Sequence, residues 1–201
     1  MKKVVLFVLL DQYADWEMPY CACAIKTLSK NEVEVKTVSL TKDMIQSIAG
    51  IHTLVDFDLT SIPQEYEGVI LIGGNTWRDE NAREVKHLVD DCLCKKKVLG
   101  AICDATTFLG SIGVLNNIVH TSNDLQGLKE FSQNNYTNES NYQFKQVVRD
   151  GHIVTANGTA SLEFAKEIAS ALNIADKDEI SRFYDFYHYG YCEVMKGNRN
   201  E

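Results

Sequence analysis

Cys103 stands where a strand is expected to turn directly into a helix. The apolar run over 97–102 predicts a short buried strand, and 104–112 predicts a helix, with no loop residue between them. Such a junction forces a sharp, strained turn that lifts the side chain toward the helix N-terminus. The free N–H groups and the dipole of that helix favour an anion. We therefore expect Cys103 to have a lowered pKa and to be a thiolate nucleophile, with a buried core cysteine as the alternative.

Two further features follow predicted buried strands. Glu17 comes after the first strand of the chain, and the pair Gly73-Gly74 comes directly after a later one. Adjacent glycines let a backbone N–H approach a ligand closely, so the N–H groups of Gly74 and Asp104 are expected to form an oxyanion hole. The alternatives are a plain tight turn for the glycines and a solvated helix-start carboxylate for Glu17.

Alternating strands and helices must position these residues. The patterns predict strands at 3–10, 33–39, 69–72, 97–102 and 116–121, hairpins over 44–57 and 142–156, and helices over 16–30 (capped by Asp15), 79–94, 104–112, 160–173 and 176–189. Apolar strands that alternate with helices indicate an α/β fold: a three-layer sandwich with a mainly parallel sheet and helices on both faces. The carboxyl ends of parallel strands share one edge of the sheet, so Glu17, Gly74 and Cys103 should converge there.

Composition bounds the class of protein. The chain has 201 residues, 45% of them hydrophobic, and a net charge of −8, which suits a single domain over residues 1–201 and gives no basic surface for nucleic acid. No apolar run is long enough for a membrane span, and the apolar start is expected to be a core strand rather than a signal peptide. The six cysteines are then expected to be reduced thiols in a cytoplasmic protein. Their spacing favours no metal site, and no cofactor is expected.

Four segments resemble the ThiJ/PfpI family of the class I glutamine amidotransferase-like superfamily. They are Ala14-Asp15-Trp16-Glu17-Met18, Leu71-Ile72-Gly73-Gly74-Asn75, Ala101-Ile102-Cys103-Asp104-Ala105 and the segment 150–160, in the family's order and over nearly the whole chain. The resemblance implies a flavodoxin-like fold and a homodimer. It also implies that Cys103 is the nucleophile, that the carboxyl group of Glu17 contacts its sulfur, and that Gly74 and Asp104 offer N–H groups.

The chain departs from the family pattern at the base. Peptidase-like members carry a histidine directly after the cysteine, where this chain has Asp104, and other members carry one at a position that aligns near Asn123. His120 lies nearby in the sequence, and His120, Asn123, Gly73 and Asn75 complete the list of candidate site neighbours. Because a Cys–His pair handles protons in acyl transfer, its absence counts against peptidase and glutaminase activity.

Two classes of function therefore stay open. In the first, the protein is a cysteine-dependent hydrolase or a glyoxalase- or deglycase-like enzyme of weak activity, acting on a small carbonyl or amide substrate. In the second, it is a non-enzymatic oxidative-stress sensor or regulatory protein, in which Cys103 is oxidised to a sulfinic acid held by Glu17.

Overall fold

A seven-stranded sheet forms the centre of the molecule in a computed structural model that describes residues 2–197. Its strands are β1 (Lys3–Val8), β2 (Val33–Ser39), β5 (Phe57–Asp58), β6 (Gly68–Leu71), β7 (Val98–Ile102), β8 (Val147–Asp150) and β9 (Ile153–Ala156). Their spatial order is β5-β2-β1-β6-β7-β9-β8, and every neighbouring pair is parallel except β8 with β9. The predicted α/β class and mainly parallel sheet are confirmed.

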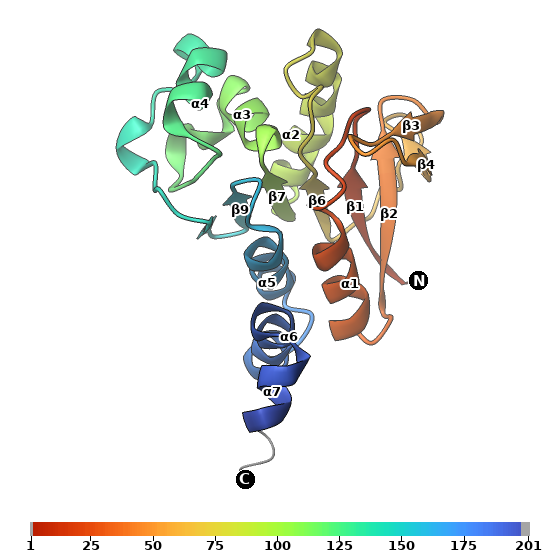
Figure 1. Cartoon of the computed structure of the whole chain (residues 1–201). Helices are drawn as coiled ribbons and strands as arrows, with labels where there is room; N and C mark the ends of the chain where they lie inside the picture. Colours follow the sequence, from red (N-terminus) through yellow and green to blue (C-terminus); the bar gives the residue numbers. More distant parts are fainter. Residues whose placement is uncertain (1, 198–201) are drawn as a thin grey trace.

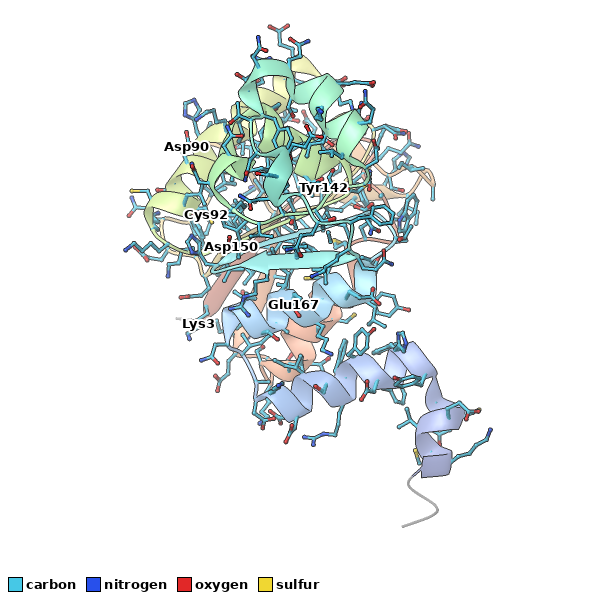
Figure 2. The ribbon with its side chains drawn as sticks, turned by 90° about the vertical axis from the view of Figure 1, so that its left-hand side faces the viewer. Lys3, Asp90, Cys92, Tyr142, Asp150 and Glu167 are labelled. Carbon is cyan, nitrogen blue, oxygen red and sulfur yellow. The ribbon has the colours of Figure 1, made fainter. Side chains whose placement is uncertain are left out.

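Helices cover both faces of this sheet (Figure 1). One face carries α1 (Pro19–Leu28) and α5 (Ser161–Leu172), and the other carries α2 (Lys86–Cys94), α3 (Asp104–Ser111) and α4 (Leu125–Ser132). In Figure 2, Cys92 on α2 lies on one side of the sheet and Glu167 on α5 on the other. The helix α6 (Lys177–Tyr189) lies outside α5, and α7 (Tyr191–Gly197) extends away from the body of the molecule. None of the helices in residues 2–197 is long and apolar enough to cross a membrane.

The strands are apolar on both faces because each face is covered. In β1, Val5 and Phe7 belong to the core beneath α1 and α5, whereas Leu6 and Val8 belong to the opposite core. All four side chains are fully buried. Burying an aliphatic or aromatic side chain of this kind contributes about 1.5–3 kcal/mol, so this sheet is a rigid support for the loops at its edge.

The predicted hairpin over 44–57 is shorter than expected. β3 (Met44–Gln46) and β4 (His52–Leu54) pair antiparallel in a sheet of their own, while residues 57–58 leave the hairpin and join β2 as the edge strand β5. The predicted hairpin over 142–156 is likewise shorter at its start, because β8 begins only at Val147. The first half of the helix predicted over 79–94 is a 3-10 helix, η1 (Glu80–Val85).

The strand predicted over 116–121 is wrong. Residues Val114–Asn117 form a 3-10 helix, η2, and His120 forms only a single bridge, with Tyr142. The amide nitrogen of Asn138 donates to the carbonyl oxygens of Leu115 and Ile118 at 2.8 and 2.9 Å, so a side chain satisfies the backbone that a strand neighbour would otherwise bond.

The expected Asp15 cap is also wrong, because its carboxylate accepts from the N–H of Ala49 at 2.9 Å and α1 begins at Pro19. A helix that the sequence patterns did not predict, α4, is capped by Asp124, whose carboxylate accepts from Gly127 N–H at 2.6 Å. The short 3-10 turns η3 (Gln133–Asn135) and η4 (Glu139–Asn141) connect α4 to β8.

The chain changes direction across the sheet at β1. After β2 is placed on one side of β1, the chain returns to place β6 on the other side. In sheets of this kind, ligands bind outside the carboxyl ends of the strands at such a switch point. The loops after β1 and β6, which hold Glu17 and Gly73, begin at this point.

Candidate functional site

The turn expected at Cys103 is present. This residue separates β7 from α3 with φ 60° and ψ −132°, a backbone conformation that residues other than glycine rarely adopt. Such strain costs about 1–3 kcal/mol and persists only where the surroundings hold it. Here the N–H of Cys103 donates to the carbonyl oxygen of Ala156 on the neighbouring strand β9 at 3.0 Å.

Glu17 lies against Cys103 and is fully buried. Its Oε2 accepts a hydrogen bond from the N–H of Gly73 at 2.8 Å. A Cβ atom on Gly73 would lie 2.5 Å from both the Cβ of Cys103 and the Oε2 of Glu17, so only glycine lets the three groups approach each other. The other oxygen, Oε1, accepts no hydrogen bond of standard geometry from the residues that the structure describes, although the Cys103 side chain lies close enough to lower the pKa of the Glu17 carboxyl.

Gly158, in the loop after β9, closes the opposite side of the sulfur. A Cβ atom there would lie 2.9 Å from the Sγ of Cys103 and 3.2 Å from the Oε1 of Glu17. The N–H of Gly158 donates to Asn123 Oδ1 at 2.8 Å, and Asn123 Nδ2 donates to the sulfur at 3.3 Å. The indole N–H of Trp16 bonds the carbonyl oxygen of Gly158 at 2.9 Å. We call Cys103, Glu17, Gly73, Asn123 and Gly158 the Cys103 site.

Burial governs the protonation of the site. It raises the pKa of Glu17 from an ordinary 4.5 to about 7, against the lowering effect of the bonds from Cys103 and Gly73 and with the charge of Asp104 adding to the rise. Burial, followed by the negative charge of Glu17, raises the pKa of the Cys103 thiol to about 12. The thiolate pKa below the ordinary range, expected from the helix N-terminus alone, is therefore wrong. The N–H of Asp104 and the amide of Asn123 do lower the pKa of Cys103, but burial outweighs them.

The two groups titrate as a pair. Because each charge opposes the other, the pair loses its first proton near pH 7 and retains the second until strongly alkaline pH. Around and above neutral pH it therefore carries one negative charge and one proton, which can pass between sulfur and carboxyl oxygen. A thiol beside a carboxylate is one form, and a thiolate that accepts a bond from a carboxylic acid is the other.

An ion pair lies directly beside the nucleophile position. Arg78 donates to both carboxylate oxygens of Asp104, from Nε and from an Nη, at 2.7 Å each. Sequence reasoning missed Arg78, because nothing in the segment after Gly73-Gly74 indicates that its side chain reaches α3. It missed Gly158 and Trp16 as site residues for the same reason, although the rule that sites gather at the carboxyl ends of strands applies to the loop after β9.

The two predicted oxyanion donors have different environments. The N–H of Gly74 donates to no acceptor in residues 2–197, so it is free to bind a ligand oxygen. The N–H of Asp104 instead points to the sulfur of Cys103. The N–H of Asn75 donates to the carbonyl oxygen of Gln12 at 3.1 Å, which fixes the loop after the glycine pair.

His120 is not a partner of Cys103. It is fully buried, with Nε2 bonded to the hydroxyl of Tyr136 and Nδ1 to the carbonyl of Ile118, both at 2.9 Å. Burial lowers its pKa. Because both ring nitrogens are occupied, the ring is a structural link rather than a neighbour of the site. Within residues 2–197, no three His, Cys, Asp or Glu side chains are grouped as a metal site requires.

A cavity adjoins the site through Asn123. Its volume is about 330 Å³, and one wall is Phe144, whose surface is 93% exposed. The other lining residues are Ser122, Lys145, Gln146 and Asn157. A larger cavity of about 520 Å³ lies beside Arg83 and Gly113 and includes no residue of the Cys103 site.

Known proteins share both the sequence pattern and the architecture. The model of the DJ-1/PfpI family matches residues 2–171. The uncharacterized protease YdeA of Bacillus subtilis is 38% identical over 194 residues, covering 94% of this chain and 95% of YdeA. The uncharacterized protease YoaZ of the same organism is 32% identical over 189 residues, covering 91% of this chain and 89% of YoaZ. The crystal structure of the thiJ/pfpI family protein from Bacillus anthracis matches with a TM-score of 0.84 and 29% identity, covering 93% of this chain and 91% of that one.

Proposed function

The chain belongs to the DJ-1/PfpI family, and from this premise we propose that it is a cysteine-dependent enzyme acting on small reactive carbonyl compounds. Cys103 is the nucleophile and Glu17 carries the protons. The observation that supports the proposal is the pair itself: a fully buried carboxyl group whose pKa is raised to about 7 lies against the sulfur of the half-buried Cys103. A proton carrier is most effective when its pKa lies near the working pH.

The first step follows from the two forms of the pair. The thiol proton passes to the carboxylate of Glu17, and the thiolate attacks the carbonyl carbon of an aldehyde. The carbon–oxygen π electrons move to the oxygen, which the free N–H of Gly74 stabilises. Glu17 then gives its proton to that oxygen, which leaves a hemithioacetal on Cys103 and a carboxylate on Glu17.

A 2-oxoaldehyde such as methylglyoxal can react further with the same two residues. The carboxylate of Glu17 removes the proton from the former aldehyde carbon to give an enediol and returns it to the neighbouring carbon, while the hydroxyl proton of the hemithioacetal passes to the oxygen on that neighbouring carbon. The product is a thioester of a 2-hydroxy acid, which water hydrolyses to release the acid and the thiol. Methylglyoxal and water thus give lactate, and no external oxidant or reductant is needed.

Amide hydrolysis is less favoured by the site. The relatives YdeA and YoaZ are named proteases, and a hydrolase role for the same thiol is compatible with those names. However, a departing amine must be protonated, and in cysteine enzymes a histidine usually donates that proton. His120 bonds to Tyr136 and Ile118 instead. We therefore expect turnover of aldehydes to exceed that of peptides.

Consumption of methylglyoxal by the purified protein tests this proposal. Cys103→Ser should abolish turnover, and Glu17→Gln should lower kcat by about 100-fold or more, since a positioned proton carrier is worth about 10²–10⁴-fold. Glu84→Gln removes an exposed carboxylate and should change nothing. Full turnover in Cys103→Ser would contradict the proposal.

The second candidate is a peroxide sensor, and it is favoured by the Oε1 of Glu17, which accepts no hydrogen bond of standard geometry within residues 2–197. Two molecules of hydrogen peroxide would oxidise the Cys103 thiol to a sulfinic acid and release two molecules of water. The new oxygens would lie among Oε1, Asn123 Nδ2 and the N–H of Asp104. Such contacts made only in the folded state should raise the melting temperature after peroxide treatment, but not in Cys103→Ser. An enzyme should show aldehyde turnover before treatment and no rise after it.

A further inference from the structure

Asp104 places a carboxylate directly after the nucleophile, in a position that Arg78 covers. The side chain of Asp104 is only 15% exposed, and Arg78 occupies both of its oxygens. The guanidinium group also lies over the ring of Phe131 on α4, 5.5 Å from its centroid. The loop after β6 thus supplies a cation that is held between α3 and α4.

The charges around the sulfur come from several elements. The loop after β1 contributes Glu17, α3 contributes Asp104, and Asp124 at the start of α4 acts on Arg78. Without Arg78, Asp104 would present an unpaired carboxylate beside the site, and its charge opposes a further negative charge on the Glu17–Cys103 pair. A bidentate guanidinium both offsets the charge of Asp104 and fixes where its oxygens point.

We propose that Arg78 is a positioning residue that holds and neutralises the Asp104 carboxylate, so that Cys103 can react as a thiolate without an imidazole beside it. The proposal rests on Cys103 being the nucleophile of the proposed function. It explains why an aspartate can directly follow the nucleophile: Asp104 and Arg78 together form a nearly neutral unit at the first turn of α3. Lysine would replace the charge but not the two parallel bonds.

Alkylation of Cys103 measures this effect without any substrate. The rate of labelling by iodoacetamide, followed by peptide mass mapping between pH 5.5 and 9.5, should rise as the Glu17–Cys103 pair loses its first proton. Arg78→Gln leaves Asp104 uncompensated and should move the midpoint up by about one pH unit, the lower end of the effect of a nearby charge. Labelling below the midpoint should then be about tenfold slower.

A double-mutant cycle separates the role of Arg78 from a general charge effect. Asp104→Asn leaves the cation unpaired, so the midpoint should move down, whereas the double variant Arg78→Gln/Asp104→Asn should return close to the wild-type midpoint. Arg78→Lys should fall between wild type and Arg78→Gln. Arg182→Gln, which removes an exposed arginine on α6, is the matched control and should leave the midpoint unchanged.

Three results would overturn the proposal. The first is an unmoved midpoint in folded Arg78→Gln. The second is a shift caused by Arg78→Gln that is as large in the Asp104→Asn background as in the wild type. The third is a midpoint that does not fall in Asp104→Asn. The last comparison decides the matter if Arg78→Gln fails to fold. A shifted profile in a protein that leaves methylglyoxal unchanged would refute the proposed function but support the role of Arg78. Absence of any labelling at Cys103 in the wild type would refute both.

Discussion

Replacing Glu17 by glutamine should stabilise the protein at pH 8 and remove part of its pH dependence. Glu17 is fully buried, and its pKa rises from 4.5 in the unfolded chain to about 7 in the folded protein. Between these values the folded state binds more protons than the unfolded state, so stability falls as the pH rises through this window. The stabilising contribution of the protonated carboxyl is complete below pH 4.5 and lost above pH 7.

The size of the effect follows from the same two values. The interval from 4.5 to about 7 corresponds to about 3 kcal/mol at most, at 1.36 kcal/mol for each tenfold change in proton affinity. For a chain of 201 residues, 1 kcal/mol moves the melting temperature by about 2–4 °C, so the full effect is about 6–12 °C. Glutamine keeps the shape of the side chain and an oxygen for the N–H of Gly73, and it carries no charge.

Melting temperatures of wild type and Glu17→Gln at pH 5 and pH 8 provide the assay. The carboxylates with lowered pKa values, such as Asp56 and Asp91, destabilise both proteins equally on acidification and cancel in the comparison. We expect the melting temperature of Glu17→Gln, relative to that of the wild type, to be higher at pH 8 than at pH 5. Parallel curves over this range would refute the argument that a buried charge forms at the pair.

Three further substitutions probe the surroundings of the sulfur. Gly158→Ala places a Cβ 2.9 Å from Sγ, so we expect the free energy of unfolding in urea to fall by about 1–3 kcal/mol and the alkylation of Cys103 to slow. The control Gly151→Ala places a Cβ in open space and should leave alkylation unchanged, so equal labelling rates in the two variants would contradict this prediction. Asn123→Ala removes a donor to the sulfur and should slow alkylation at pH 8 by about tenfold, and a faster rate would count against the 3.3 Å contact. His120→Phe should lower stability by about 1–3 kcal/mol without changing alkylation, and slower labelling would mean that the ring does serve the site.

The sheet could be predicted because its signals are local. Apolar runs such as 69–72 are buried on both faces, and glycine after a strand indicates a turn wherever the strand lies. The element patterns fail where side chains at a distance decide the backbone. Asn138 bonds the carbonyl groups of Leu115 and Ile118 and prevents the strand expected there. Asp15 meets the requirements of a cap, yet it bonds Ala49, 34 residues away.

The sequence predicts which residues form the site better than it predicts their pKa values. The strand-to-helix junction at Cys103 and the topology bring Glu17 and Gly73 to the same sheet edge, as expected. A helix N-terminus predicts a lowered thiol pKa, but the degree of burial, which raises the pKa instead, depends on Gly158 and the loop after β9. Arg78 is separated from Asp104 by 26 residues, and only the folded arrangement brings them together.

The bond from Trp16 to Gly158 joins segments 142 residues apart in the chain. Contacts of such long sequence separation carry the largest loop-closure entropy and form late, after the local helices and the neighbouring parallel strands. During synthesis from the N-terminus, Glu17 and Cys103 are made before Gly158, so the sulfur cannot be covered by Gly158 until the loop after β9 has been added. A partly folded chain exposes the thiol to oxidants and alkylating agents that the finished fold restrains, so the order of assembly decides when this cysteine is chemically vulnerable.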